Sequence, residues 1–268
     1  MSDLEIALKL ADIAQEVSLS RFGAGDLKIT TKPDLTPVSD ADKLAEEKIR
    51  EYLQQVAPND GVIGEEFAEK KSSNNRQWIL DPIDGTKNYI KGVPIWANLI
   101  ALRVDGVVTT GVVNAPAISR RWYASAGNGA YVEEYLLGDK KRRKIGVSKV
   151  AQISDASFAF AEVIKKDNWE DRYEKFIQLI NQVWRSRGFG DFWAHMLVAE
   201  GAVDFTVEPK LALWDMAALE IIVKEAGGRF TNILGVDGIA GPGAIASNNL
   251  LHQAVVKLLN YYLIASGN

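Results

Sequence analysis

WILDPIDGTKNYIKG (residues 78–92) holds two aspartates, Asp81 and Asp84, that are separated only by a proline and an isoleucine. The apolar residues 78–80 before them are typical of a buried strand, which we expect to end at Asp81. Two carboxylates this close repel each other unless a cation lies between them. With the carbonyl oxygen of Ile83 they form a set of hard oxygen ligands, which suits Mg²⁺ or Mn²⁺ better than zinc. The stretch therefore predicts a metal site at the end of a strand.

Gly85 and Thr86 follow the second aspartate and open a predicted helix. Glycine lets a ligand come close to the backbone, and the free N–H groups at the start of a helix accept a phosphate. The hydroxyl of Thr86 can also orient a water molecule. Metal-binding acids beside an anion site suggest metal-assisted attack of water on a phosphate ester. A structural Ca²⁺ site and an inert metal-bound scaffold are the alternatives that these residues leave open.

Further acids stand where strongly apolar segments begin or end. A carboxylate in such a place is held by rigid structure yet points out of the core. Taken singly, an acid of this kind is usually a helix cap or a surface residue. The further candidates are Asp42, Glu65, Glu66 and Asp215.

The composition limits the possible functions. The chain has 268 residues, 47% of them hydrophobic, which is enough for one large domain or two small ones. A net charge of −4 argues against a general nucleic-acid binder, and the lack of cysteine excludes disulfides, a thiol nucleophile and a zinc–thiolate site. No apolar run reaches the roughly 18 residues needed to span a bilayer, so we expect no membrane association. No signal-peptide core follows the acidic N-terminus, and we expect a cytoplasmic protein.

Two other features give weaker signals. His195 and His252 lie far apart in the sequence without a partner motif, so ordinary packing or surface placement is expected for both. The basic run GDKKRRK (138–144) could form an anion or nucleic-acid patch. We favour a solvated hairpin tip between two strands, because charge runs usually face solvent.

The pattern of apolar residues predicts an α+β chain with mostly antiparallel strands. It forms a single unit, with possible sub-domains 1–150, which carries the metal and phosphate motifs, and 151–268. The expected helices cover residues 4–22, 41–56, 171–183, 191–201, 213–228 and 249–263. The expected strands cover residues 61–66, 95–104, 107–116, 120–127, 130–134, 202–208, 228–232 and 243–248. Two tight turns at 105–106 and 128–129 and a helix cap at Ser39 or Asp40 are also expected.

Five stretches resemble the inositol monophosphatase family, and the match covers nearly the whole chain. They are KPDLTPVSDAD (32–42), GEE (64–66), DPIDGTKNY (81–89), WDMAALEIIVKEAGG (214–228) and GAIASNNLLHQAV (243–255). The resemblance implies a layered α-β-α-β-α sandwich and a homodimer. It also implies Mg²⁺-dependent hydrolysis of a phosphomonoester, often inhibited by lithium. Two or three Mg²⁺ ions per site are implied, with Mn²⁺ as a substitute.

The resemblance also assigns roles residue by residue. The two clustered aspartates would each hold a different Mg²⁺, which removes the repulsion between them. Glu65 and Thr86 would activate the attacking water, and Asp42 would lie beside a third metal and support Thr86. The N–H groups of Gly85 and Thr86 would hold the phosphate. The implied metal ligands are Glu65, Asp81, the Ile83 carbonyl, Asp84 and Asp215.

A finer resemblance concerns the substrate. Lys87, Trp96 and the pair Gly190-Asp191 look most like the histidinol-phosphate phosphatases of this fold. Histidinol carries an ammonium group, which the carboxylates of Asp191 and Glu208 would bind. Asp191 has an alternative role as the cap of the helix that follows it. The implied substrate contacts are Arg187, Asp191 and Glu208.

Other reactions and one other class of protein are alternatives. Inositol-1-phosphate, fructose-1,6-bisphosphate or a 3′-phosphoadenosine nucleotide could replace histidinol phosphate as the substrate. A catalytically inactive protein that binds a metal or a phosphate ligand is disfavoured, because it would have no need of the full set of acids together with Thr86.

Overall fold

Seven helices and two main sheets are found in the residues that a computed structural model describes, which are 1–33, 35–136, 139–161, 163 and 169–265. The helices are α1 (Asp3–Arg21), α2 (Asp40–Val56), α3 (Thr86–Ile90), α5 (Tyr173–Gln182), α6 (Asp191–Ala199), α7 (Leu213–Glu225) and α8 (His252–Ala265). The larger sheet has seven strands in chain order: β3 (Gly61–Gly64), β4 (Arg76–Asp84), β5 (Ala97–Val104), β6 (Val107–Ala115), β7 (Arg120–Ser125), β8 (Ala130–Leu136) and β9 (Asp139–Lys144). The smaller sheet has five strands in the order β11 (Arg185–Gly188), β10 (Ser157–Phe160), β12 (Phe205–Glu208), β14 (Ala244–Ser247) and β13 (Arg229–Thr231). A separate antiparallel pair is formed by β1 (Ile29–Thr31) and β2 (Pro37–Ser39).

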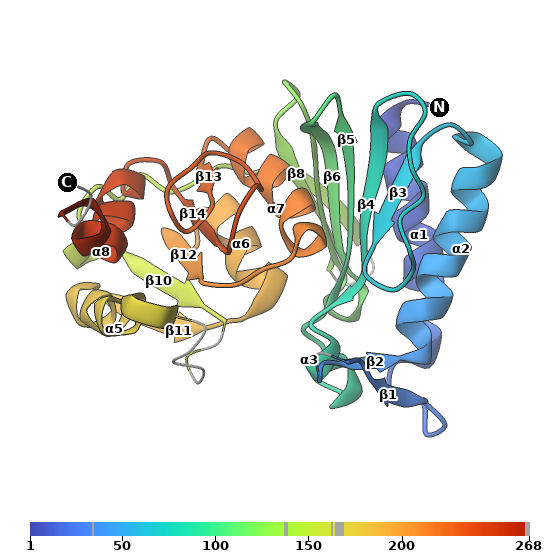
Figure 1. The fold of residues 1–268 in the computed structure, drawn as a ribbon, viewed down its shortest axis with the longest axis horizontal. Coiled ribbons are helices and arrows are strands. Elements are labelled where there is room, and N and C mark those ends of the chain that lie inside the picture. Colours follow the sequence, from blue (N-terminus) through green and yellow to red (C-terminus); the bar gives the residue numbers. More distant parts are fainter. Residues whose placement is uncertain (34, 137–138, 162, 164–168, 266–268) are drawn as a thin grey trace.

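The two sheets alternate with three layers of helices, as Figure 1 shows. Helices α1 and α2 cover one face of the larger sheet, and α6 and α7 lie between the two sheets. Helices α5 and α8 cover the far face of the smaller sheet. The α+β class and the α-β-α-β-α sandwich predicted from the sequence are therefore confirmed.

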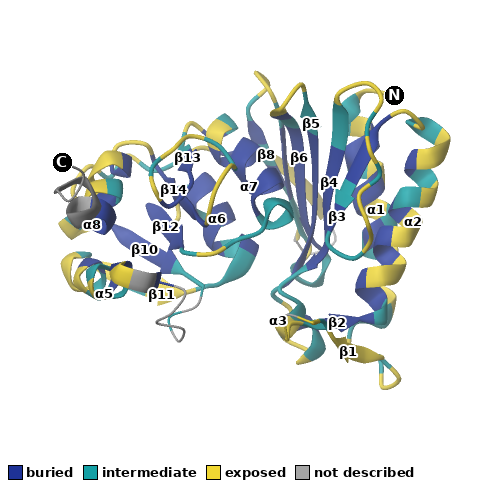
Figure 2. Ribbon diagram, in the orientation of Figure 1, coloured by how far each residue is buried: buried dark blue, intermediate teal, exposed yellow. Residues whose placement is uncertain are grey.

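Helices cover both faces of the larger sheet. Side chains on either face of β4 are therefore buried, which explains the continuous apolar run at residues 78–80. Side chains alternate between the two faces of a strand. Trp78 and Leu80 pack against α1 and α2, whereas Ile79 between them packs against the layer of α6 and α7. Figure 2 shows the resulting band of buried residues in the central strands. β4 is therefore held rigidly up to the residues that carry the two aspartates.

A bulge interrupts the pairing of β4 with β5 between Asp81 and Asp84. Asp81 lies opposite Leu99 and Asp84 lies opposite Ala97, so three steps along β4 match two steps along β5. In a regular strand, residues three apart point to opposite faces, and the extra residue of the bulge brings both aspartates to one side. The expected end of the strand at Asp81 is therefore wrong, because β4 continues through the bulge to Asp84.

Three strands of the structure differ from the sequence prediction. The basic run is not a hairpin tip, because Asp139–Lys144 forms the exposed edge strand β9, paired with β8. Residue 138 of that run lies outside the described residues. Strands β10 and β11 were not among the expected strands, since four residues are too short to show a period. Basic side chains on an exposed edge such as β9 hinder pairing with another chain.

The start of helix α2 agrees with the sequence prediction. Ser39 caps α2, as one of the two predicted alternatives: its backbone N–H and its hydroxyl both donate to the carboxylate of Asp42, at 2.9 and 2.5 Å. The cap therefore also fixes the position of a predicted site residue.

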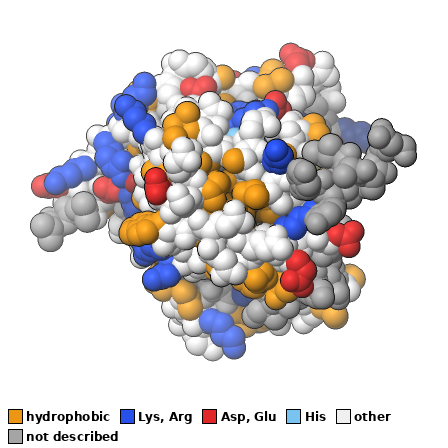
Figure 3. All heavy atoms as spheres, turned by 90° about the vertical axis from the view of Figure 1, so that its left-hand side faces the viewer, with side chains coloured by type: hydrophobic (Ala, Val, Ile, Leu, Met, Phe, Trp, Pro, Cys, Tyr) orange, Lys and Arg blue, Asp and Glu red, His pale blue; other side chains and the backbone are white. Residues whose placement is uncertain are grey.

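The end of the molecule where α5 and α8 lie carries acidic, basic and hydrophobic side chains next to one another (Figure 3). This mixture agrees with the small net charge of −4. Within the described ranges, no helix combines the length and the apolar character needed to cross a membrane.

Gly111 of β6 leaves room for α7 to pack against the larger sheet. A Cβ atom at this position would lie 2.5 Å from Cγ2 of Ile221 and 2.9 Å from the carbonyl oxygen of Ala218. Gly111→Ala should therefore lower the free energy of unfolding by about 1–3 kcal/mol, the usual effect of overpacking, when measured by urea denaturation. Gly25→Ala is the control, because no heavy atom lies within 4 Å of a Cβ atom placed there. Equal stability of the two variants would contradict this account of the packing.

Candidate active site

A cavity of about 570 Å³ collects the predicted site residues. Its wall is formed by the end of β4, the start of α3, the residues just before α6 and the segment between β12 and α7. These segments are distant in the sequence, so the cavity is a product of the tertiary structure. The predicted metal ligands that line it are Glu65, Asp81, Ile83, Asp84 and Asp215.

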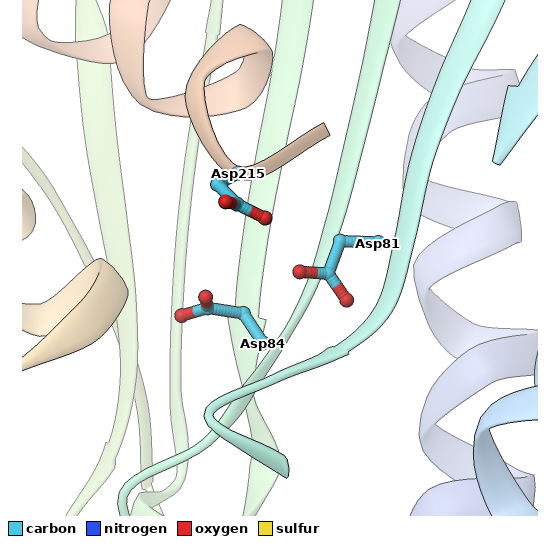
Figure 4. Close-up of side chains that lie close together, drawn as sticks. All are labelled: Asp81, Asp84 and Asp215. Carbon is cyan, nitrogen blue, oxygen red and sulfur yellow. The ribbon is translucent and has the colours of Figure 1, made fainter. Parts of the chain in front are cut away.

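Three of these residues form a compact cluster of carboxylates. Asp81 and Asp84 come from β4, and Asp215 comes from the first turn of α7, as Figure 4 shows. Each offers one oxygen atom, and these three atoms all lie within 4.8 Å of one another. The cluster is thus able to hold a metal ion with oxygen ligands alone, which fits Mg²⁺ or Mn²⁺.

The backbone fixes each carboxylate of the cluster, because each accepts one N–H group. The donors are Ile83 for Asp81 (3.0 Å), Phe192 for Asp84 (2.8 Å) and Ala212 for Asp215 (2.7 Å). The donors to Asp84 and Asp215 lie at the starts of α6 and α7, so these two helices orient the carboxylates of Asp84 and Asp215. Asp215 makes a capping contact at the start of α7, one of its two predicted roles, and its role as a metal ligand stays a prediction.

Burial raises the pKa of all three clustered aspartates, and the neighbouring carboxylates raise it further. The pKa values of Asp81 and Asp84 lie well above the ordinary value. Burial raises the pKa of Asp215 to about 7, against the opposing N–H of Ala212. The ionised cluster is therefore unfavourable without a nearby positive charge, which a divalent cation supplies.

Glu65 lies at the edge of this cluster and has a basic partner. Nζ of Lys32 donates to Oε1 of Glu65 and to Oε1 of Glu66, both at 2.6 Å. Burial lowers the pKa of Lys32, but the two carboxylates outweigh it and raise the pKa overall. Lys32 belongs to a stretch that carried the family resemblance, yet no role was predicted for it.

A further residue that sequence reasoning missed is Glu46 of α2. Its buried carboxylate accepts Nε of Arg50 at 2.8 Å and the backbone N–H of Glu66 at 2.9 Å. It also fills the space where Gly64 would carry a side chain, since a Cβ atom there would lie 2.1 Å from Oε1. Glu46 therefore holds the end of β3, which presents Glu65 to the cavity.

Thr86 and Asp42 lie together, as their predicted roles require. The hydroxyl of Thr86 is 3.0 Å from the carbonyl oxygen of Ile83 and 3.4 Å from Oδ1 of Asp42. Burial raises the pKa of Asp42 to about 6, although Ser39 opposes the shift with two hydrogen bonds. The hydroxyl is thus held beside the metal ligands by two oxygen acceptors.

Gly85 begins α3 with a backbone that favours glycine. Its φ of +82° lies in the left-handed region. A Cβ atom would also approach Oδ2 of Asp191 and the carbonyl oxygen of Ile95, each at 3.1 Å. The backbone conformation and the close packing thus both favour glycine here, and Gly85 lines the cavity, while the approach of a ligand to its backbone stays a prediction.

The predicted substrate contacts fall into two groups. Asp191 and Glu208 line the cavity together with the predicted metal ligands. Asp191 is not the N-cap of α6, which is Gly190, and its Oδ2 accepts Nδ2 of Asn88 at 3.3 Å. Arg187 does not line the cavity, because it is exposed on β11 and donates to the carbonyl oxygen of Ser186 at 2.7 Å.

Both histidines are buried, which agrees with ordinary packing, one of the two placements predicted for them. His252 packs between Thr231 and Ser247, with hydrogen bonds of 3.1 and 2.8 Å. His195 instead contacts Glu208, with Nε2 lying 2.9 Å from Oε1. Residues 191 and 195 are four apart and share a face of the helix, but no signal in the sequence links His195 to Glu208 on β12.

Comparisons with known proteins identify the family of the chain. A model of the inositol monophosphatase family matches residues 2–262. A histidinol-phosphatase of Mycobacterium tuberculosis is 50% identical over 260 residues, which cover 96% of this chain and 98% of that protein. A histidinol-phosphatase of Streptomyces coelicolor is 48% identical over 269 residues, 97% of each. The solved structure of an IMPase of Thermotoga maritima matches with a TM-score of 0.84 at 29% identity and covers 100% of both chains. The chain belongs to the inositol monophosphatase family.

The raised pKa values predict that Mg²⁺ binding depends on pH. The pKa of Asp215 in the folded protein is about 7, above the ordinary 3.8, so the metal-free fold loses stability as the pH rises through this range. A carboxylate must lose its proton before it binds a metal. Added Mg²⁺ should therefore raise the melting temperature more at about pH 8 than at about pH 6.

Asp84→Asn is the matched variant for this measurement, because it keeps the shape of the side chain and removes one anionic ligand. Its melting temperature should respond much less to Mg²⁺ at both pH values. A Mg²⁺ response that is the same at both pH values and in both proteins would contradict the assignment of the cluster.

Proposed function

We propose that the protein is a Mg²⁺-dependent phosphomonoesterase that hydrolyses histidinol phosphate to histidinol and phosphate. The observation that carries this proposal is a single cavity lined by three clustered carboxylates, by Thr86 and by two further acids, Asp191 and Glu208. The two histidinol-phosphatases at 50% and 48% identity support the choice of substrate.

The metal ligands in this proposal are oxygen atoms only. Bound Mg²⁺, two or three ions per site, would neutralise charge on the phosphate and lower the pKa of the attacking water. Mn²⁺, another hard cation, would substitute for it. The proposed ligands are Glu65, Asp81, the carbonyl oxygen of Ile83, Asp84 and Asp215.

Thr86 and Glu65 would prepare the water for its attack. The Thr86 hydroxyl donates to the carbonyl oxygen of Ile83 or to Asp42, which leaves its oxygen atom to accept a hydrogen bond from the water. Glu65 would take the proton, because the contact with Lys32 engages only Oε1 and leaves Oε2 available. The residues thus provide water activation without a covalent intermediate.

Different residues of the cavity would bind the phosphate and the alcohol. The N–H groups of Gly85 and Thr86 at the start of α3 would donate to the phosphate oxygens. Asp191 and Glu208 would face the ammonium group of histidinol, to which a carboxylate gives a charge-assisted hydrogen bond. Arg187 remains a prediction, and from its place on β11 it would need to move in order to reach a ligand. A neutral polyol such as inositol-1-phosphate gains less from two carboxylates.

Several further properties belong to the same proposal. The family resemblance supports a homodimer that lithium inhibits. The net charge of −4, the lack of cysteine and the lack of a long apolar run support a cytoplasmic protein without a nucleic-acid or membrane partner. The chain would be a single unit with sub-domains 1–150 and 151–268, since the larger sheet ends at Lys144 and the smaller one begins at Ser157. Phosphate release with Mg²⁺ separates this proposal from an inactive binding protein, which would release none.

Thr86→Ala tests the role of the hydroxyl. The chemical step should slow by about 10²-fold or more, the usual scale for the loss of acid–base assistance, while Mg²⁺ still raises the melting temperature. Thr86→Ser is the matched control, because it keeps the hydroxyl and should retain most of the turnover. A change in KM alone for Thr86→Ala would show that the hydroxyl does not act on the attacking water.

The substrate is tested by comparing kcat/KM for histidinol phosphate, inositol-1-phosphate and p-nitrophenyl phosphate. We expect histidinol phosphate to be preferred. Glu208→Gln should reduce its advantage over p-nitrophenyl phosphate by one to two decades, because a hydrogen bond to a charged group contributes about 1.5–3 kcal/mol. Glu47→Gln, an exposed carboxylate on α2, is the control and should leave the ratio unchanged. A wild-type preference for inositol-1-phosphate would refute the substrate and leave the phosphatase activity in place.

A further inference from the structure

We propose that His195 is a positioning residue that orients the Glu208 carboxylate toward the cationic part of the substrate. This inference rests on the function proposed above. His195 lies on α6, and Glu208 is the last residue of β12. The 2.9 Å contact between Nε2 and Oε1 joins the helix to the strand directly at the wall of the cavity.

The surroundings of the His195 ring determine which nitrogen carries its proton. The side chain is fully buried, and Nδ1 has no hydrogen-bond partner in the described part of the chain. A proton on Nδ1 would be buried without an acceptor, which is unfavourable. The proton of a neutral ring therefore lies on Nε2 and is donated to Glu208.

A neutral donor is suited to a carboxylate that has to bind a cation. The imidazole N–H fixes the orientation of the Glu208 carboxylate without neutralising its negative charge. A Lys or Arg at position 195 would neutralise that charge. Because Oε1 of Glu208 is engaged by His195, Oε2 is the oxygen that remains for the cavity.

Both partners are held firmly by the fold. The ring of His195 packs near the ring of Phe230, with 5.7 Å between the centroids. Glu208 pairs with Ala244 through the ladder of β12 and β14. Asp191, the other proposed cation ligand, stands on the same helix as His195, four residues earlier. The contact therefore ties the helix that carries Asp191 to the strand that carries Glu208, and a preorganised pair of carboxylates binds a small cation with less loss of entropy.

The test uses the full-length enzyme with Mg²⁺ and compares three substitutions. His195→Phe and His195→Asn remove the donor from the position of Nε2, whereas the amide of His195→Gln is long enough to place a donor there. We expect His195→Phe and His195→Asn to raise KM for histidinol phosphate about tenfold, the effect of losing one hydrogen bond to a charged group. The ratio of kcat/KM between histidinol phosphate and p-nitrophenyl phosphate should fall by the same factor. His195→Gln should restore at least half of the lost preference on a logarithmic scale.

A double-mutant cycle separates positioning from a purely structural role. In a Glu208→Gln background, His195→Phe should change the ratio by less than about twofold, because the carboxylate that His195 orients is already absent. The inference is wrong if His195→Phe lowers kcat/KM equally for both esters, or if the two substitutions act independently on the ratio. Should His195→Phe fail to fold, as shown by its melting curve, the pair His195→Asn and His195→Gln decides the question.

The wild-type enzyme separates this inference from the function on which it rests. If it shows no preference for histidinol phosphate over p-nitrophenyl phosphate, both the proposed substrate and the role of His195 are wrong. If it shows the preference and the His195 variants keep it, the substrate stands and only the positioning role is refuted.

Discussion

The alternation of side chains along a β-strand is the constraint on which the whole site depends. Asp81 and Asp84 are three residues apart, an odd number, so a regular strand would turn them to opposite faces. The bulge in β4 adds one residue and turns both to the cavity, where they meet Asp215. Nδ2 of Asn98 on β5 donates to the carbonyl oxygen of Pro82 at 2.7 Å, which satisfies a backbone group within the bulge. A small irregularity inside a rigid sheet thereby creates the centre of the site.

The clustering of three carboxylates is electrostatically unfavourable, because like charges repel each other. The clustered carboxylates are withdrawn from solvent, and both burial and mutual repulsion disfavour their charged forms. One backbone N–H per carboxylate offsets part of this cost, and a divalent cation would offset the rest. The same property that destabilises the metal-free fold would make the site bind metal strongly, so stability and function are linked through the cation.

The second wall of the cavity depends on the packing of helices between the sheets. The absence of a side chain at Gly111 allows α7 to approach β6, and α7 carries Asp215 in its first turn. Helix α6 starts at the edge of the cavity with Asp191 and donates its Phe192 N–H to Asp84. Residues proposed for the metal centre and for the substrate are therefore positioned by the same two helices, so one cavity can bring them together.

The sequence by itself determined the chemistry of the site and the class of the fold. Residue types and short spacings are local properties, so the oxygen ligands around Asp81, the open backbone at Gly85 and the apolar periods of the main helices could be read directly. Only the tertiary structure decided the bulge that aligns the aspartates and the edge strand β9. It also decided two contacts between distant residues: Lys32 with Glu65, 33 residues away, and His195 with Glu208, 13 residues away. Those features arise from strand register and from side chains brought together by packing, and no local pattern in the sequence encodes which distant partner a buried polar group will meet.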